Sequence, residues 1–171
     1  MFSSNKPIIQ IAYAVENIIV AAENWSKRFN IGPFYYNEHI EVADSRINGI
    51  NKKFDHSSAY GWRENFMIEL IADHSKVNVH ENGIHHIAWI AENFDREAED
   101  LIKQDCKEVL FARAGDRNGM RFAWFDPGRD IGHLYEIYDN NVSLKNFYSY
   151  VYNASLEWDG TNPVRHISEI G

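Results

Sequence analysis

Hydrophobic and polar positions follow the same order in two halves of the chain. The stretch at 10–18, Gln-Ile-Ala-Tyr-Ala-Val-Glu-Asn-Ile, returns at 86–94 as His-Ile-Ala-Trp-Ile-Ala-Glu-Asn-Phe. In each copy a polar residue opens an apolar strand, and a Glu-Asn turn then leads into an amphipathic helix. The pattern therefore predicts two copies of one structural unit.

The first half reads as a strand, a helix and further strands. Pro7 begins an extended run over 8–15, and Asn17 is suited to cap the helix that follows. Gly32 and Pro33 are expected to end this helix, since proline cannot continue it. Further strands are predicted at 34–36, 59–62 and 66–71, with a loop at 49–53 and a polar connector at 72–83.

The second half repeats this order and then departs from it. Strands are predicted at 85–91, 109–111, 120–125 and 133–138, and Asn93 again precedes a helix. Residues 143–158 have helical spacing, and a polar tail follows. We interpret residues 1–171 as one domain, made of modules at 7–72 and 83–140 and a C-terminal helix and tail at 141–171. This last helix would pack on the modules or on a second subunit.

Four polar residues stand in the apolar strands at matching places in the two halves. Gln10 and His86 open the first strand of each half, and Glu69 and Glu136 lie in the last. By strand alternation each lies on a mainly apolar face, where a lone carboxylate costs several kcal/mol to bury. Any one of them alone could be a satisfied core residue or a solvent-facing one. All four together favour a site for Zn²⁺, Ni²⁺, Co²⁺, Mn²⁺ or Fe²⁺.

Composition and charge limit the expected cellular location and the classes of binding partner. A chain of 171 residues with 44% hydrophobic and 25% charged residues is typical of one globular domain. The net charge of −8 argues against nucleic acid or an anionic membrane as a partner. Cys106 has no second cysteine to pair with, and no stretch has the length of a membrane span or the form of a signal peptide. We therefore expect a cytoplasmic protein.

Two motifs carry a family resemblance: Gly-Ile-His-His-Ile-Ala at 83–88 and Gly-His-Leu-Tyr-Glu-Ile at 132–137. They resemble the vicinal oxygen chelate superfamily, which includes glyoxalase I, methylmalonyl-CoA epimerase, extradiol dioxygenases, and fosfomycin and bleomycin resistance proteins. Segments 30–34 and 158–160 resemble a glyoxalase-like branch of it. The resemblance implies an α+β fold with two tandem βαβββ modules that form an open, cupped mixed sheet, here with an added C-terminal helix. It also implies a homodimer.

The same resemblance implies one divalent metal ion in the cup, with ligand positions that map to Gln10, Glu69, His86 and Glu136. This set is similar to that of glyoxalase I. It implies a metal-dependent lyase or isomerase that removes a proton next to a carbonyl through a metal-stabilised enediolate. Glu69 or Glu136 would be the base, with Glu136 preferred as ligand and Glu69 as the mobile base. The partner would be a small molecule with an enolisable carbonyl.

Residues near the expected cup are candidates for a substrate pocket. Trp62, Met67 and Phe122 would line an apolar pocket, and Arg121 could hold an anionic part of the substrate. Two other functions stay open. One is an iron-dependent extradiol-type dioxygenase, which Gln10 disfavours because a histidine would be expected there. The other is a ligand-binding or resistance-type protein, which would not need two glutamates.

The remaining histidines have simpler interpretations. His85 adjoins His86, so strand alternation places it on the opposite face of the sheet, with a structural role. His56, His74 and His80 fall in predicted loops or connectors and are expected to be solvated.

Overall fold

The computed structural model describes residues 7–80 and 83–170, and the strands among them form one curved, mixed sheet. The first half holds β1 (Gln10–Ala14), α1 (Ile18–Phe29), β2 (Phe34–Asn37), β3 (Val42–Ile47), β4 (Ile50–Asn51), β5 (His56–Arg63) and β6 (Phe66–Asp73). The second half holds β7 (Ile84–Ile90), α2 (Phe94–Lys103), β8 (Lys107–Ala114), β9 (Arg121–Asp126) and β10 (Leu134–Tyr138). The C-terminal region holds α3 (Val142–Leu156), β11 (Val164–His166) and a short 3₁₀ helix, η1 (Ile167–Glu169).

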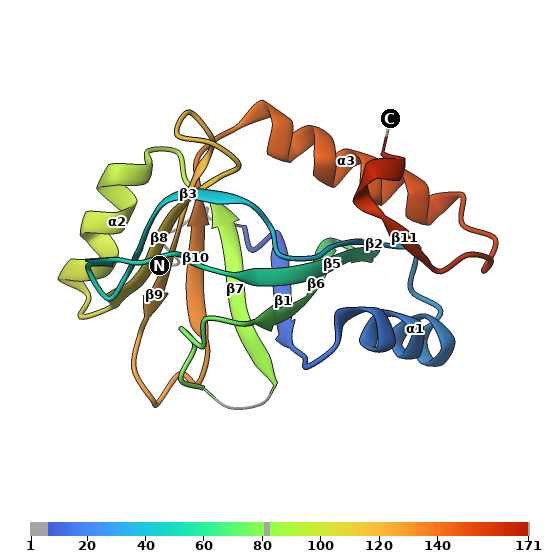
Figure 1. Ribbon diagram of the computed structural model, residues 1–171, viewed down its shortest axis with the longest axis horizontal. Coiled ribbons are helices and arrows are strands. Elements are labelled where there is room, and N and C mark those ends of the chain that lie inside the picture. The colour runs from blue at the N-terminus through green and yellow to red at the C-terminus, as the bar shows by residue number, and fades with distance from the viewer. Residues whose placement is uncertain (1–6, 81–82, 171) are drawn as a thin grey trace.

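The two halves have the same strand order and meet through their first strands. β1 pairs antiparallel with β7 at the centre, and each pairs in parallel with the last strand of its own half, β6 or β10. The full order is β11-β2-β5-β6-β1-β7-β10-β9-β8-β3-β4. The predicted α+β fold of two repeated modules with a C-terminal helix is confirmed (Figure 1).

The repeated Glu-Asn turns start both predicted helices. The side chain of Asn17 accepts hydrogen bonds from the first turn of α1, and that of Asn93 does so in α2. Buried α1 residues pack with β5 and β6 in one apolar cluster, and buried α2 residues pack with β8, β9 and β10 in another. Each helix thus covers one face of its own module, and the other face is left for the cup.

One hairpin of the first half crosses to the second half. β3 pairs antiparallel with β8, although it follows β2 in sequence. For residues 41–65 the sequence pattern indicates one or two strands, the clearest at 59–62, and a loop at 49–53. The structure has three strands there, β3, β4 and β5, and β4 (Ile50–Asn51) lies within the predicted loop. As a result, the segment between β2 and β3 becomes part of the cup's wall.

The C-terminal region packs on the modules of its own chain. α3 contacts β5, and its buried residues Tyr148 and Val151 pack with Tyr35 and Met67. Figure 1 shows α1 and α2 near opposite ends of the sheet and α3 along its upper side. The tail, for which the sequence analysis predicted no strand, adds β11 to the sheet in parallel with β2. No helix in the described ranges is long and apolar enough to cross a membrane.

Candidate metal centre

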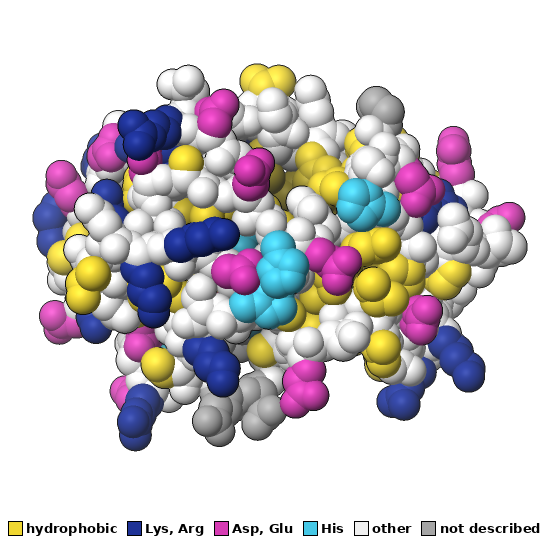
Figure 2. All heavy atoms as spheres, in the orientation of Figure 1, with side chains coloured by type: hydrophobic (Ala, Val, Ile, Leu, Met, Phe, Trp, Pro, Cys, Tyr) yellow, Lys and Arg dark blue, Asp and Glu magenta, His cyan; other side chains and the backbone are white. Residues whose placement is uncertain are grey.

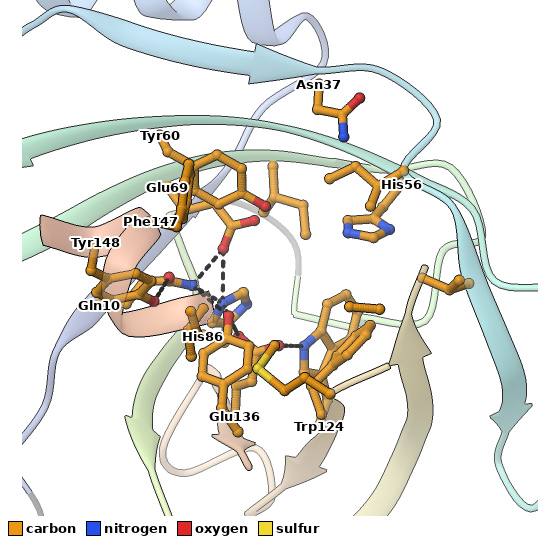
Figure 3. A pocket seen from close by; sticks show the side chains of 18 of the residues that line it. Gln10, Asn37, His56, Tyr60, Glu69, His86, Trp124, Glu136, Phe147 and Tyr148 are labelled. Carbon is orange, nitrogen blue, oxygen red and sulfur yellow. Dashed lines mark hydrogen bonds and ion pairs between the residues drawn. The ribbon is translucent and has the colours of Figure 1, made fainter. Parts of the chain in front are cut away.

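Four side chains from the central strands meet at the base of the cup (Figure 3). Gln10 lies on β1, Glu69 on β6, His86 on β7 and Glu136 on β10, and all four are at most 3% exposed. His86 Nε2 lies 3.1 Å from Glu69 Oε2 and 2.7 Å from Glu136 Oε2. Gln10 Nε2 lies 2.6 Å from Glu69 Oε2 and 3.0 Å from His86 Nε2. The structure thus brings together the four residues that the repeat singled out.

The charges of this cluster depend on one another. Burial by itself would lower the pKa of His86, but Glu136 and Glu69 raise it to about 10. Burial would raise the pKa of Glu69, but hydrogen bonds and charge from His86, together with Ser58, lower it. With His86 protonated, the cluster holds one positive imidazolium and two carboxylates. One buried negative charge is then left without a positive partner.

Each carboxylate has a second partner that orients it. Ser58 Oγ donates a hydrogen bond of 2.5 Å to Glu69 Oε1. The indole N–H of Trp124 donates to Glu136 Oε1 at 2.9 Å, and the Tyr138 hydroxyl donates to Oε2 at 2.7 Å. The sequence analysis assigned no role to Ser58 or Tyr138. Tyr138 lies two residues after Glu136 on β10, and Ser58 on β5 pairs with Ile71, two residues after Glu69 on β6, so each lies on the same face of the sheet as its glutamate.

The amide of Gln10 is turned with its nitrogen toward the cluster. Its Nε2 also donates to the Tyr138 hydroxyl at 3.1 Å, and its Oε1 accepts a hydrogen bond from the Tyr148 hydroxyl. A metal ion would take the oxygen, so a half-turn of the amide is needed before Gln10 can be a ligand. Tyr148 comes from α3, and its sequence signal was only an apolar position at helical spacing.

The donor set fits a divalent cation. Glu69, His86 and Glu136 each offer one ligand atom, and these atoms lie within 4.8 Å of one another. Two carboxylates and one imidazole are ligands that Zn²⁺, Mn²⁺, Co²⁺ and Ni²⁺ accept. A divalent ion with a neutral imidazole would also balance the two carboxylate charges, which the imidazolium does only by half.

A cavity of about 200 Å³ opens above the cluster. Its base is formed by the four central residues, and most of its wall is apolar or aromatic. Residues from both modules and from the C-terminal region line the wall. They include Ile40 and Val42 from the crossing segment (residues 38–47, which lead from β2 into β3), Phe122 from β9, and Leu144 and Phe147 from α3. The cavity therefore has a charged base and an apolar wall, as binding sites for small molecules commonly do.

Of the predicted pocket residues, Phe122 lines the cavity, but three others do not. Met67 is fully buried beneath α3, where it packs with Tyr148 and Val151. Trp62 faces Tyr148 and Tyr152 on another side of that helix. These placements correct the prediction, and the reason is that α3 covers this part of the sheet.

Arg121 is also placed outside the cavity. Its guanidinium lies 3.0 Å from Asp139 Oδ1 and 2.7 Å from Asp95 Oδ1, and it stacks over the Phe94 ring at 4.4 Å from the centroid. These ion pairs connect β9 with the residue that follows β10 and with the first turn of α2. The expectation that Arg121 holds a substrate is therefore corrected to a role in the fold.

Three histidine predictions were wrong. His80, expected to be solvated, has a side chain that is only 9% exposed and lies 3.1 Å from Asp126 Oδ1. The other two concern His85 and His56. A bulge in the β1–β7 ladder pairs Ala12 with His86 and Tyr13 with Ile84, which leaves His85 as the extra residue. The rings of His85 and His86 both contact Trp124, a residue of the cavity wall, so alternation fails at this point. His56 is buried and lines the cavity, stacked on Phe54, and burial lowers its pKa.

Comparison with known proteins identifies the family. The sequence model of the Glyoxalase/Bleomycin resistance protein/Dioxygenase superfamily matches residues 9–124, and the chain belongs to this superfamily. This confirms the family resemblance that the motifs indicated. The family description covers enzymes as well as resistance proteins, so membership alone does not choose between catalysis and binding.

Solved structures share the fold at low identity. A methylmalonyl-CoA epimerase in complex with methylmalonyl-CoA and NH₄⁺ is 16% identical, with a TM-score of 0.50, and the match covers 81% of this chain and 97% of that one. The methylmalonyl-CoA epimerase from Mycobacterium tuberculosis is 16% identical, with a TM-score of 0.52 and coverage of 85% and 96%. A hypothetical protein from Bacillus halodurans C-125 is 15% identical, with a TM-score of 0.52 and coverage of 81% and 96%. No curated protein matches the sequence.

Proposed function

We propose that the protein is a metal-dependent lyase or isomerase that removes a proton from the carbon next to a carbonyl in a small molecule. The observation that carries this proposal is the buried cluster of Glu69, His86 and Glu136 at the base of an apolar cavity. Two carboxylates kept this close, with donors aimed at them, suit a site in which one carboxylate helps to hold a cation and the other moves a proton. The fold likeness to methylmalonyl-CoA epimerases is in keeping with isomerase chemistry.

The residues have distinct roles in this proposal. His86 and Glu136 would hold the cation, and Gln10 would be a further ligand with its amide oxygen turned toward the cluster. When bound, the divalent ion would act as a Lewis acid that polarises the carbonyl and offsets the negative charge that develops on proton removal. Glu69 takes the proton from carbon and, once protonated, can return it to the same or a neighbouring carbon.

The partners of the two glutamates favour this division. Glu136 is held at both oxygens, at Oε1 by the Trp124 indole, a rigid ring whose N–H has one fixed direction, and at Oε2 by the Tyr138 hydroxyl of its own strand. Glu69 is held by the Ser58 hydroxyl, which rotates and can follow the carboxylate as it moves. Burial and the nearby carboxylates raise the pKa of Tyr60 and Tyr138, so both stay neutral hydroxyl donors at the site.

The cavity wall also limits the substrate class. The described residues that line it include no lysine or arginine, so an anionic group of the substrate inside the cavity would have only the bound cation as a positive partner. A volume of about 200 Å³ is below the range of about 300–1,000 Å³ for pockets that hold drug-sized ligands. We infer that the reactive end of the substrate enters the cavity, and a larger or charged remainder stays outside it.

Hydrogen–deuterium exchange in heavy water tests the proposed proton removal and does not require the physiological substrate to be known. Purified protein, analysed for bound metal, is mixed with a panel of carbonyl compounds: a glutathione hemithioacetal, methylmalonyl-CoA and small hydroxy-ketones. Nuclear magnetic resonance then follows loss of the proton next to the carbonyl. We expect exchange of at least one compound, with Glu69→Gln keeping the metal but losing exchange and Glu136→Gln losing both.

Glu64→Gln is the matched control, because Glu64 is an exposed glutamate in the β5–β6 turn. It should keep both metal and exchange. Tight binding of a compound without exchange would instead support a ligand-binding or resistance-type protein, a function that the apolar wall also suits. Iron as the bound metal, with oxygen consumption, would support the dioxygenase. The homodimer and the cytoplasmic location stay predictions.

A further inference from the structure

A second group of metal-ligating side chains lies apart from the buried cluster. It consists of His39 between β2 and β3, Asp55 just before β5, and His74 just after β6. Each offers one ligand atom, and these atoms lie within 4.8 Å of one another. Figure 2 shows histidine and acidic side chains gathered near the middle of the face that it draws. We propose that His39, Asp55 and His74, here called the outer cluster, bind a divalent transition-metal ion.

Contacts among these side chains hold the outer cluster together. His39 Nδ1 lies 2.9 Å and 3.1 Å from the two carboxylate oxygens of Asp55. Ser57 Oγ accepts from the His39 backbone N–H at 2.9 Å and lies 2.8 Å from His74 Nε2. The rings of His39 and His74 stack at 4.8 Å between centroids and 27° between planes. Three segments distant in sequence thus already aim their ligands at one place.

The backbone conformation of His39 sets the direction of its polar groups. Its φ is +48°, in the left-handed region, where seven other described non-glycine residues also lie, so the conformation by itself does not mark a site. At His39 the conformation directs the N–H to Ser57 and the ring to Asp55.

The distances and charges suit Zn²⁺, Cu²⁺ or Ni²⁺. Tetrahedral zinc binds nitrogen and oxygen at about 2.0–2.2 Å, which places ligand atoms about 3.3 Å apart. His39 and Asp55 already meet this spacing, and the side chains of His39 and Asp55 are 68% and 35% exposed, with room to adjust. Two imidazoles and one carboxylate leave a coordination position for water. The ion would add positive charge to a protein of net charge −8.

The outer cluster borders the wall of the main cavity. Asn37 and Ile40, on either side of His39, line the cavity, and so does His56, which follows Asp55. An ion there would fasten the crossing segment to the start of β5. The outer cluster would therefore be a structural clamp on the cavity wall, and the inference does not rest on the proposed reaction.

Zinc titration against a chromophoric chelator tests the outer cluster. The background is Glu69→Gln with Glu136→Gln, which removes both carboxylates from the buried cluster. We expect one Zn²⁺ per chain in this background, with His39→Ala and His74→Ala each weakening the affinity at least tenfold. His166→Ala is the matched control, because His166 is exposed and lies outside both clusters. Its affinity should equal that of the background.

Copper identifies the ligands directly. Electron paramagnetic resonance of the Cu²⁺-loaded background should show two coordinated imidazole nitrogens, and His39→Ala should show one. Zn²⁺ at 100 times its dissociation constant for the background should raise the melting temperature of the background by about 5–10 °C, and His39→Ala should reduce this rise to about half or less at the same Zn²⁺ concentration.

The inference fails if His39→Ala and His74→Ala bind Zn²⁺ as tightly as the background, or if only millimolar affinity is found. If circular dichroism shows that the double variant does not fold, the titration is made on the wild-type protein. We then expect two Zn²⁺ ions per chain in wild type and one in His39→Ala. A negative result would not affect the buried cluster, because the metal content and proton exchange of Glu69→Gln test that site separately.

Discussion

His85 and His86 meet through their Nδ1 atoms, which lie 2.9 Å apart in the buried cup. Two ring nitrogens at this distance share one hydrogen, so one ring donates and the other accepts. When His86 Nε2 faces a cation, its Nδ1 carries the hydrogen and His85 accepts it. His85 Nε2 then lies toward Asp73, 3.8 Å from Oδ2. The bulge that places His85 here thus determines which nitrogen of His86 can bind a metal ion.

Replacing His85 should weaken metal binding at the buried cluster. His85→Phe removes the acceptor that orients His86, and loss of such a partner typically costs about 10–100-fold in metal affinity. His85→Gln keeps an acceptor and should retain most of the affinity. Competition with a chelator measures both values. Equal affinity in His85→Phe and wild type would show that the ring only fills space.

Removing the hydroxyl of Tyr148 should loosen α3 from the cup. The hydroxyl donates to Gln10 Oε1, and Tyr148→Phe leaves that buried oxygen without its partner. We expect the free energy of unfolding to fall by about 1–2 kcal/mol, measured in urea. Tyr152→Phe on the exposed side of the same helix should change it by less than about 0.5 kcal/mol. Similar losses in both variants would contradict a specific link between Tyr148 and Gln10.

Asp139 should contribute stability that depends on pH. Burial would raise its pKa, but hydrogen bonds and charge from Arg121 lower it below its usual value near 3.8. A carboxyl with a lowered pKa stabilises the folded state above its unfolded pKa, and the contribution is lost as pH falls through the folded pKa. Asp139→Asn should therefore reduce the free energy of unfolding by about 1–2 kcal/mol at pH 7.

This difference from wild type should shrink as the pH falls below about 4, as urea unfolding at several pH values would show. Asp130→Asn, at an exposed aspartate in the β9–β10 turn, is the control and should have little effect at either pH. A difference that stays constant down to pH 3 would mean that Asp139 acts through packing and not through its charge.

Gly32 should be needed for the docking of the tail. A Cβ at this position would lie 2.9 Å from the Trp158 ring, closer than real contacts allow. Gly32→Ala should displace this ring and cost about 1–3 kcal/mol of unfolding free energy. The tail should then be cleaved faster in limited proteolysis. In a Trp158→Ala background the same change should cost much less, and an unchanged cost there would place the strain elsewhere.

Much of the fold and of the metal cluster could be predicted because the signals are local. The Glu-Asn turns predicted both N-caps, since Asn17 and Asn93 need only their own first helical turn as partners. Strand alternation predicted that each of the four polar residues lies on a mainly apolar face of its own strand. The repeat indicated that the two modules would bring these faces together.

The remaining features depend on contacts between distant segments. Alternation fails at His85, because a bulge is set by the pairing of β1 with β7. The pocket prediction failed at Met67 because α3, whose position sequence periodicity does not determine, covers that side of the sheet. The crossing of β3 to β8 likewise brought Val42 into the wall.

The sequence by itself therefore determined the repeated modules, their helix starts and the residue types at the base of the cup. Each of these follows from the backbone geometry of a strand or a helical turn. Only the tertiary structure decided which residues surround the cavity, how Gln10 is turned, and that His39, Asp55 and His74 meet. These arrangements arise from the packing of segments far apart in the chain, and no local pattern encodes them.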